Sequence, residues 1–311
     1  MKLVFIVKST IRNKKKFWED YELFQRKNVV EFTEVWESEY FRHSISLAEK
    51  ATLEGYDYII AVGGDGTLNE VLNGIMLASI KVRELPQLGM LPYGSANDFS
   101  KTIGITPDIS LLVEAIEKDH STLIDIGKIE LTDEDGQPVT RYFINVFDAG
   151  IGADVVRKVN ASNKPLGTRF TFIKAILGSL LTYTPTPLVC KTDHEIIEDR
   201  MLSFVIANGS FFGDGMCIAP DARVNDGSFS VVAVADISVK DYILNTRKLR
   251  KKMKIDHPKV SYHKAHIVEI FPKHYSCSIE TDGEFAGYAP AKTSMMHHAI
   301  RFTGTLTQGV Q

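Results

Sequence analysis

Val62-Gly63-Gly64-Asp65-Gly66-Thr67-Leu68-Asn69-Glu70 is the stretch that decides the fold of this chain. It follows Tyr58 to Val62, a short apolar run of the kind that a buried parallel strand uses. After it, apolar residues recur at helical spacing, and Thr67 and Glu70 have capping-box spacing, which predicts a helix start here. Three glycines let backbone amides approach a ligand, and a helix N-terminus favours an anion. The stretch is thus a candidate phosphate seat, although an ordinary tight turn shares this pattern.

A second loop, Leu91 to Phe99, also follows an apolar strand and contains a glycine. Gly94 and Ser95 offer an amide and a hydroxyl group to a phosphate. Asn97 and Asp98 suit either substrate contact or plain helix capping. In the first loop, the Asp65 carboxylate beside phosphates indicates a bound metal ion or a proton transfer.

Strands and helices alternate over the first 125 residues, which predicts a doubly wound, mainly parallel sheet. The predicted strands are Leu3 to Val7, Val29 to Thr33, Tyr58 to Val62 and Leu88 to Leu91. Ligands bind such sheets at the carboxyl ends of the strands, and both glycine loops leave the sheet at that edge.

Beyond residue 125 the pattern changes to short strands with turn signals, which predicts a β-sandwich-like domain. We therefore expect an α/β domain at residues 1–125 and a β-rich domain at 126–295. The tail, about 296–311, is expected to pack back on the first domain. The absence of a long linker predicts an active site in a cleft between the domains.

Composition narrows the class of protein. The chain has 311 residues, is 44% hydrophobic and carries a net charge of −3, which argues against nucleic-acid binding. Its three cysteines are few and widely spaced, as suits a reducing cytosol. The apolar runs are too short for a signal peptide or a membrane span, so we expect a soluble, cytoplasmic protein.

The two glycine loops together resemble the diacylglycerol kinase catalytic-domain family of soluble bacterial lipid kinases. Further landmarks of the family follow in order: Asp125-Ile126-Gly127, Asn145 to Gly152, Asn208-Gly209, Ala219-Pro220-Asp221-Ala222, Asn225-Asp226-Gly227 and Asp282-Gly283-Glu284. The resemblance covers nearly the whole chain. It implies an ATP-dependent kinase that phosphorylates the hydroxyl of diacylglycerol or a similar lipid, giving phosphatidic acid.

The resemblance also implies where the nucleotide binds. Ser95 stands where the family commonly has Thr, Thr33 is placed at the end of the second strand, and Asp65 is expected to anchor the Mg²⁺ of the nucleotide. The full set of implied contacts is Lys8, Ser9, Thr33, Gly63, Gly64, Asp65, Gly66, Thr67, Asn69, Glu70, Gly94, Ser95, Asn97 and Asp98.

The family's catalytic segment matches Asp282-Gly283-Glu284, which implies that Glu284, or its neighbour Asp282, deprotonates the lipid hydroxyl. Asp-Gly is also the commonest hairpin signal, so a plain turn between strands is the alternative. The family's structural Mg²⁺ falls on the carbonyls of Arg223 and Ser228 and on the side chain of Asp226.

Two segments depart from the family pattern. Lys8-Ser9 stands where the family has an Asn-Pro pair that helps to hold the nucleotide, so either these residues substitute or nucleotide affinity is weaker. The usual glycine run of the second domain is replaced by residues 212–216, Phe-Gly-Asp-Gly-Met, which affects the acceptor side.

Several alternatives remain at this stage. The basic run Arg247 to Lys254 is either a solvated helix face or a contact with an anionic membrane, reached transiently at the inner face. A homodimer is possible. His263 and His266 lack further metal ligands nearby in the sequence, so no zinc site is expected. The rival functions are an NAD kinase-like enzyme, a sphingoid-base kinase and a non-catalytic nucleotide- or lipid-binding regulator.

Overall fold

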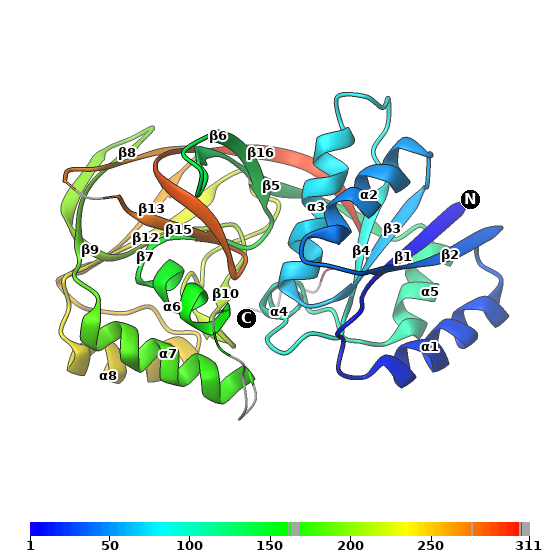
Figure 1. Ribbon diagram of the computed structural model, residues 1–311, viewed down its shortest axis with the longest axis horizontal. Helices are drawn as coiled ribbons and strands as arrows, with labels where there is room; N and C mark the ends of the chain where they lie inside the picture. The colour runs from blue at the N-terminus through cyan, green and yellow to red at the C-terminus, as the bar shows by residue number, and fades with distance from the viewer. Residues whose placement is uncertain (161, 163–167, 275, 305, 307–311) are drawn as a thin grey trace. The chain divides into compact units, whose positions relative to one another are not determined.

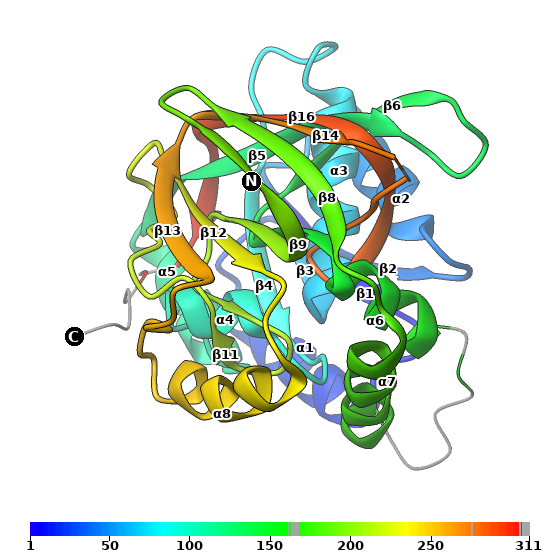
Figure 2. The same ribbon diagram turned by 90° about the vertical axis from the view of Figure 1, so that its left-hand side faces the viewer.

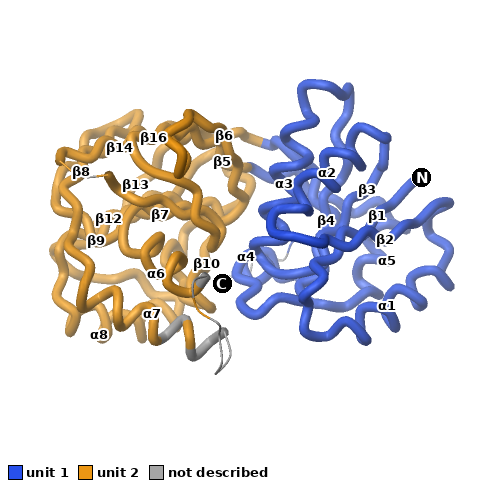
Figure 3. The backbone as a smooth tube through the Cα atoms, in the orientation of Figure 1, with its two compact units in different colours: residues 1–125, 298–311 blue, residues 126–297 orange. Residues whose placement is uncertain are grey.

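The structure is a computed structural model that describes residues 1–160, 162, 168–274, 276–304 and 306. Figure 3 shows its two compact units: unit 1 consists of residues 1–125 and 298–311, and unit 2 of residues 126–297. Strands β5 (Ser121–Thr132) and β16 (Glu284–Thr303) carry the chain between the units. Of the predicted tail, residues 305 and 307–311 lie outside the described residues.

Unit 1 is organised around a parallel sheet with the strand order β2-β1-β3-β4. The strands are β1 (Lys2–Lys8), β2 (Phe32–Ser38), β3 (Tyr58–Gly63) and β4 (Gln87–Pro92). The helices are α1 (Lys14–Lys27), α2 (His43–Leu53), α3 (Asp65–Ala78), α4 (Asp98–Ile103) and α5 (Ile109–Glu117). In Figure 1, α1 and α5 lie on one side of this sheet, and α2 and α3 on the other. The predicted doubly wound sheet is confirmed.

Burial explains why these segments form the sheet. Every residue of β3 is buried, as expected for a central strand covered by helices on both faces. Phe5 of β1 packs edge-on against Phe24 of α1, with ring centroids 5.2 Å apart. On the other face, α2 and α3 approach closely at Gly74, where an added Cβ would lie 2.2 Å from the Ile45 carbonyl oxygen.

The second strand lies later in the chain than the sequence pattern predicts. We expected Val29 to Thr33, whereas β2 spans Phe32–Ser38 and includes Glu34 and Glu37. These charges are tolerated because β2 is an edge strand: Glu37 pairs with Lys14 at 2.6 Å, and Glu34 accepts a hydrogen bond from the Trp36 indole at 2.7 Å. The apolar Val30 is buried ahead of the strand.

Unit 2 is built from antiparallel strands that fold into a closed, β-sandwich-like arrangement. The path β9-β7-β15-β16-β14-β8 returns to β9, and β12 and β13 extend it. The strands, besides β5 and β16, are β6 (Pro138–Phe143), β7 (Val146–Gly150), β8 (Thr186–Thr192), β9 (Ile196–Ala207), β10 (Phe211–Phe212), β11 (Met216–Cys217), β12 (Phe229–Ala235), β13 (Val260–Ala265), β14 (Ile267–Pro272) and β15 (Ser278–Thr281). The predicted β-sandwich-like domain is confirmed.

Within its described residues, unit 2 also contains three helices: α6 (Ile151–Asn160), α7 (Thr168–Thr182) and α8 (Val239–Arg250). Figure 2 shows all three on the same side of the strands. Alternate residues of the strands serve two cores. Phe147 and Phe204 belong to one core, whereas Val146 and Val205 belong to a second core that includes residues of all three helices. None of the helices in the described part of the chain is both long and apolar enough to span a membrane.

Candidate active site

The two glycine loops of unit 1 meet at the carboxyl edge of the sheet. The N–H of Gly94 donates to the Gly63 carbonyl at 3.0 Å. A Cβ added at Gly94 would lie 2.3 Å from the Cα of Gly64, so the loops touch through backbone atoms and only glycine fits. The structure thus brings the predicted loops together beside the N-terminus of α3, where anions bind favourably.

Asp65 joins these loops instead of presenting an unoccupied carboxylate. Its two oxygens accept hydrogen bonds from the backbone N–H groups of Asp98 at 3.0 Å and Phe99 at 2.9 Å. These are the first residues of α4, so Asp65 caps that helix. The contact gives Asp65 a positioning role that the sequence analysis missed. Its expected role as a Mg²⁺ anchor stays a prediction.

Two buried polar atoms at these loops have no hydrogen-bond partner among the described residues. They are the hydroxyl of Thr67 and the side-chain oxygen of Asn97. Both lie against the glycines: a Cβ at Gly63 would lie 2.3 Å from the Thr67 oxygen, and one at Gly94 would lie 2.5 Å from the Asn97 oxygen. Unsatisfied buried polar atoms are uncommon in native structures and call for an explanation, and a bound polar ligand is one. The residues present therefore fit a phosphate-bearing cofactor.

The capping-box prediction is wrong. Helix α3 starts at Asp65, two residues before Thr67, and its N-cap is Gly64, without a side-chain cap. The glycine turn lets the helix begin earlier, and this places Thr67 inside the first turn. Asn69 is buried and Glu70 is half-buried in the next turn.

The remaining predicted nucleotide contacts divide into two groups. Lys8 ends β1 at the same sheet edge, and the N–H of Ser9, the next residue, donates to Ser38 Oγ at 3.4 Å. Thr33, in contrast, pairs with Leu3 at the start of β2, at the opposite edge, so its placement at the end of the strand is wrong. Ser38 occupies the position that we had assigned to Thr33. Ser95, in the second loop, is exposed, whereas Gly66, in the first loop, is half-buried.

A buried carboxylate in α1, Asp20, contacts the second loop, and no motif in the sequence indicates this contact. Asp20 accepts hydrogen bonds from the Tyr93 hydroxyl and from Lys16 at 2.8 Å. Burial, and then the bond to Asp20, raise the pKa of Tyr93. The loop is therefore fixed at Tyr93 as well as at its glycine. Asp98 is likewise engaged, since Lys101 contacts its carboxylate at 2.9 Å.

In unit 2, the Asp-Gly pair forms the two-residue turn between β15 and β16. Asp282 and Gly283 have φ angles of 51° and 83°, as a hairpin turn of this type requires. The buried carboxylate of Asp282 accepts backbone hydrogen bonds, each of 2.9 Å, from Ile144, Asn145 and Val146. Asp282 therefore holds the turn against the segment Ile144 to Val146.

Glu284, two residues later, is half-buried. Another carboxylate supports the turn between these two residues, because Gly283 N–H donates to Glu280 Oε2 at 2.8 Å. Glu280 is buried and lies directly opposite Asp148 of β7 in the sheet register. Neither residue was predicted as a site residue: Asp148 lies within the landmark Asn145 to Gly152 but was given no role there, and Glu280 lies outside the quoted motifs.

Asp148 and Glu280 form a buried acidic pair. Burial raises the pKa of Asp148 to about 6, against hydrogen bonds from Ser203 at 2.6 Å and Gly152 N–H at 2.9 Å that lower it. Burial, and next the Asp148 charge, raise the pKa of Glu280 well above its usual range. A Cβ at Gly152 would lie 2.1 Å from Asp148 Oδ2, so the glycine makes room for this carboxylate.

Comparison with known proteins accounts for both units. The diacylglycerol kinase catalytic domain matches residues 2–129, and the YegS C-terminal NAD kinase beta sandwich-like domain matches residues 145–304. The diacylglycerol kinase of Staphylococcus haemolyticus is 31% identical over 246 residues, which cover 78% of this chain and 70% of that protein. This chain belongs to the diacylglycerol kinase catalytic-domain family.

Other relatives agree with this family of lipid kinases. The diacylglycerol kinase of Staphylococcus carnosus is 30% identical, over 78% of this chain and 75% of that protein. The crystal structure of a diacylglycerol kinase from Bacillus anthracis has a TM-score of 0.67, covering 97% and 96% of the two chains at 16% identity. Yeast NADH kinase complexed with NADH has a TM-score of 0.56, covering 99% of this chain and 84% of that chain at 10% identity. At these identities the structures show the shared fold alone.

The lipid-kinase family also implies a structural metal in unit 2, and the loop expected to hold it is engaged differently. Lys264 of β13 contacts Asp226 Oδ2 at 2.9 Å and Ser228 Oγ at 3.2 Å. The other Asp226 oxygen accepts a hydrogen bond from the Ser228 N–H at 3.1 Å. An ammonium group thus stands beside the carboxylate that was expected to bind Mg²⁺, and Arg223 is exposed nearby. The residues present do not fit a metal here unless Lys264 moves away.

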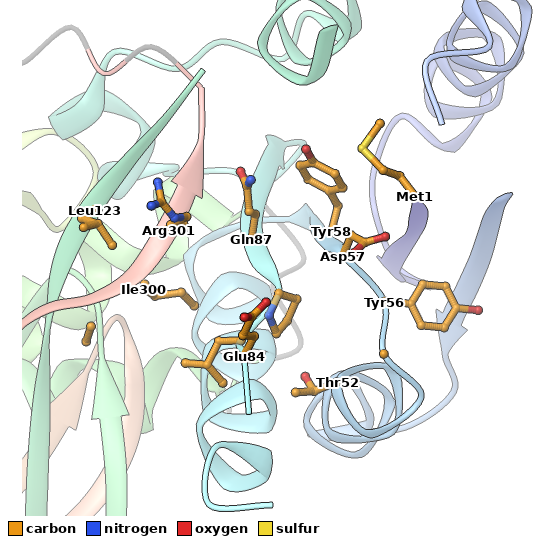
Figure 4. Close-up of a pocket in the computed structure, with 14 residues that line it drawn as sticks. Met1, Thr52, Tyr56, Asp57, Tyr58, Glu84, Gln87, Leu123, Ile300 and Arg301 are labelled. Carbon is orange, nitrogen blue, oxygen red and sulfur yellow. The ribbon is translucent and has the colours of Figure 1, made fainter. Parts of the chain in front are cut away.

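A surface pocket of unit 1 lies away from these loops (Figure 4). It is lined by residues at the amino ends of β3 and β4, including Asp57, Tyr58 and Gln87. The glycine loops leave the opposite, carboxyl edge of the same sheet, which is where α/β folds bind ligands. We therefore assign no role in the kinase reaction to this pocket.

Proposed function

We propose that this member of the lipid-kinase family transfers the γ-phosphate of ATP to the hydroxyl of diacylglycerol or a close analogue, giving phosphatidic acid. The observation that carries the proposal is that the two carboxylates of the hairpin differ in their contacts and in their exposure. Asp282 is buried and bonded to three backbone N–H groups, whereas Glu284 is only half-buried beside it. A rigid turn that presents one accessible carboxylate suits a general base.

Phosphoryl transfer depends mainly on positioning and charge neutralisation. In the proposed reaction, backbone N–H groups of the Gly63–Gly66 turn hold the phosphates, and Thr67 and Asn97 supply polar side chains there. Mg²⁺ accompanying the nucleotide would neutralise phosphate charge. Glu284 accepts the proton of the lipid hydroxyl while the oxygen of that hydroxyl attacks the γ-phosphorus and ADP leaves.

The proposal includes transient contact with an anionic membrane surface through α8 and the residues after it. Ile243, Leu244 and Met253 are each about half exposed. They lie in or beside the basic run Arg247 to Lys254, most of which is exposed as well. Exposed apolar side chains among cations are typical of helices at membrane interfaces, where each basic residue contributes about 1 kcal/mol. This surface supports access to a membrane lipid from the cytoplasmic side.

The test is release of ADP from ATP and Mg²⁺ with diacylglycerol in mixed micelles, run in parallel with sphingosine and NAD. We expect turnover that depends on diacylglycerol. Glu284→Gln should reduce kcat by 10²–10⁴-fold, in the usual range for removing a general base, with an unchanged melting temperature.

The other acceptors separate the alternatives. Turnover of NAD but not of lipid would favour an NAD kinase-like enzyme, with which the chain shares its fold. Turnover of sphingosine alone would indicate a sphingoid-base kinase. ATP binding without ADP release from any acceptor would replace the proposal with a non-catalytic regulator, and full activity in Glu284→Gln would overturn the assigned base.

A further inference from the structure

Two turns of unit 2 that lie far apart in the sequence bring three potential metal ligands together. Asp193 and His194 lie between β8 and β9, and His266 lies between β13 and β14. Strand β14 pairs with β8, with Val268 opposite Thr192, so the sheet itself places the turns side by side. Sequence spacing alone had suggested that His266 lacks nearby ligands, and the sheet register overturns that expectation.

The three donor atoms lie close enough together to contact one ion. Asp193 Oδ2 lies 2.7 Å from His266 Nδ1 and 3.3 Å from His194 Nε2. One donor atom from each residue lies within 4.8 Å of the other two. Around a tetrahedral Zn²⁺ with bonds of about 2.0–2.1 Å, ligand atoms are roughly 3.3 Å apart. The cluster therefore needs only small side-chain adjustments to surround an ion.

Surrounding bonds orient the carboxylate. The backbone N–H of His266 donates to Asp193 Oδ1 at 3.0 Å, which leaves Oδ2 directed at the two imidazoles. Thr192 Oγ1 accepts the N–H groups of His194 at 3.1 Å and Glu195 at 2.9 Å, and this fixes the turn. Outer bonds of this kind hold ligands in place and raise metal affinity.

The chemistry of the donors selects a class of ion. We propose that Asp193, His194 and His266 form a binding site for a divalent transition-metal ion of the zinc class, separate from the nucleotide-bound Mg²⁺ of the proposed reaction. Imidazole ligands suit Zn²⁺, Co²⁺, Ni²⁺ and Cu²⁺, whereas Mg²⁺ prefers oxygen ligands and keeps its waters. Three protein ligands leave a fourth position for water or another donor.

A second histidine–carboxylate pair adjoins the site. His263 Nδ1 lies 2.7 Å from Glu195 Oε1, and its Nε2 lies 2.7 Å from Ser261 Oγ. A further carboxylate, that of Glu195, thus lies next to the site.

The experiment uses the untagged full chain, stripped with a chelator and then titrated with Co²⁺ and Zn²⁺ in excess Mg²⁺. We expect one equivalent of Co²⁺ to give visible d–d absorption that Zn²⁺ displaces, and Zn²⁺ to raise the melting temperature. His266→Ala and Asp193→Asn should weaken binding at least tenfold. His274→Ala, which removes an exposed histidine of the same unit, should bind normally.

The outcomes are distinguishable from those of the kinase assay, because metal binding is measured without nucleotide or lipid. No saturable binding by the wild-type chain would overturn the proposal. Equal binding by His266→Ala and the wild type would do the same, because the ion would then sit elsewhere. Melting curves of each variant without metal establish that the protein remains folded.

Discussion

In unit 1, Gly64 and Gly94 meet through backbone atoms, whereas in unit 2 the hairpin at Asp282 is held by a side-chain carboxylate. Each glycine loop belongs to a local strand-turn-helix segment, and the two loops contact each other. Asp282, in contrast, bonds to Ile144, 138 residues earlier. The comparison shows why one site is easier to predict than the other. Close backbone contacts require glycines, and their spacing is visible in the sequence. The contacts of a buried carboxylate involve distant residues, which no local sequence pattern indicates.

The largest effect on stability is expected from a substitution of Asp282, the carboxylate that holds the hairpin of unit 2. Asp282→Asn removes the carboxylate that accepts three backbone hydrogen bonds and places amide hydrogens near their donors. We expect the free energy of unfolding to fall by about 2–4 kcal/mol. Urea unfolding measures it, with Glu284→Gln as the matched control of unchanged stability. Equal stability of both variants would show that Asp282 contributes no more to the stability of the fold than Glu284 does.

A second test uses the buried acidic pair of unit 2. Folding raises the pKa of Asp148 from 3.8 to about 6, so the folded chain holds this proton after the unfolded chain has released it. Stability is therefore lost as the pH rises from about 4 to about 6, and it stays lost above that range.

Asp148→Asn removes this charge and should stabilise the protein at pH 7 by up to roughly 3 kcal/mol, with little effect at pH 4. Melting temperatures between pH 4 and pH 8 measure the effect, with Asp199→Asn, an exposed carboxylate of the same unit, as control. A variant curve parallel to that of the wild type would show that Asp148 is ionised in the folded protein.

A smaller effect is expected from a side chain in the backbone-built region. Gly94→Ala places a Cβ 2.3 Å from the Gly64 Cα and must push the loops apart. We expect ATP affinity to fall at least tenfold, about 1.4 kcal/mol. Isothermal titration checks this on folded protein. Gly178→Ala has open space around its new Cβ and serves as control. An unchanged ATP affinity of Gly94→Ala would show that the contact between the two glycines is not needed for nucleotide binding.

The smallest effect concerns the loop expected to bind a metal. Because Lys264 contacts Asp226 there, a chelator should leave the melting temperature of the nucleotide-free protein unchanged. Lys264→Met should cost about 0.5–1 kcal/mol, as suits a partly exposed ion pair, and should make stability respond to Mg²⁺. A Mg²⁺-dependent rise in the wild type that Asp226→Asn abolishes would restore the metal site.

Sequence reasoning recovered the parts of the fold that repeat a local pattern. The course of β3, predicted as Tyr58 to Val62, follows from apolar spacing alone. It misplaced β2, because Glu34 and Glu37 look like loop residues in the sequence but are stabilised by Trp36 of β2 itself and by Lys14 of α1. That error carried Thr33 to the wrong edge of the sheet.

The candidate site divides in the same way. Gly64, Gly94 and Asn97 were predicted as neighbours and are neighbours, because strand order in a parallel sheet brings loop ends to one edge. The hydrogen bonds that Asp65 accepts from α4 and that Glu280 accepts from the hairpin turn were missed, since the sequence does not show which backbone donor a carboxylate contacts. The zinc-class cluster required the pairing of β8 with β14.

The end of β16 has a consequence for the order of synthesis. Phe302 is fully buried in unit 1, pairs with Leu88 of β4 and packs on Phe99 with ring centroids 5.7 Å apart. A ribosome makes β4 and Phe99 some 200 residues before Phe302, so the edge of β4 and the Phe99 ring stay uncovered while unit 2 is translated. Domains generally fold as they emerge. Here the first unit to begin folding is the last to be completed.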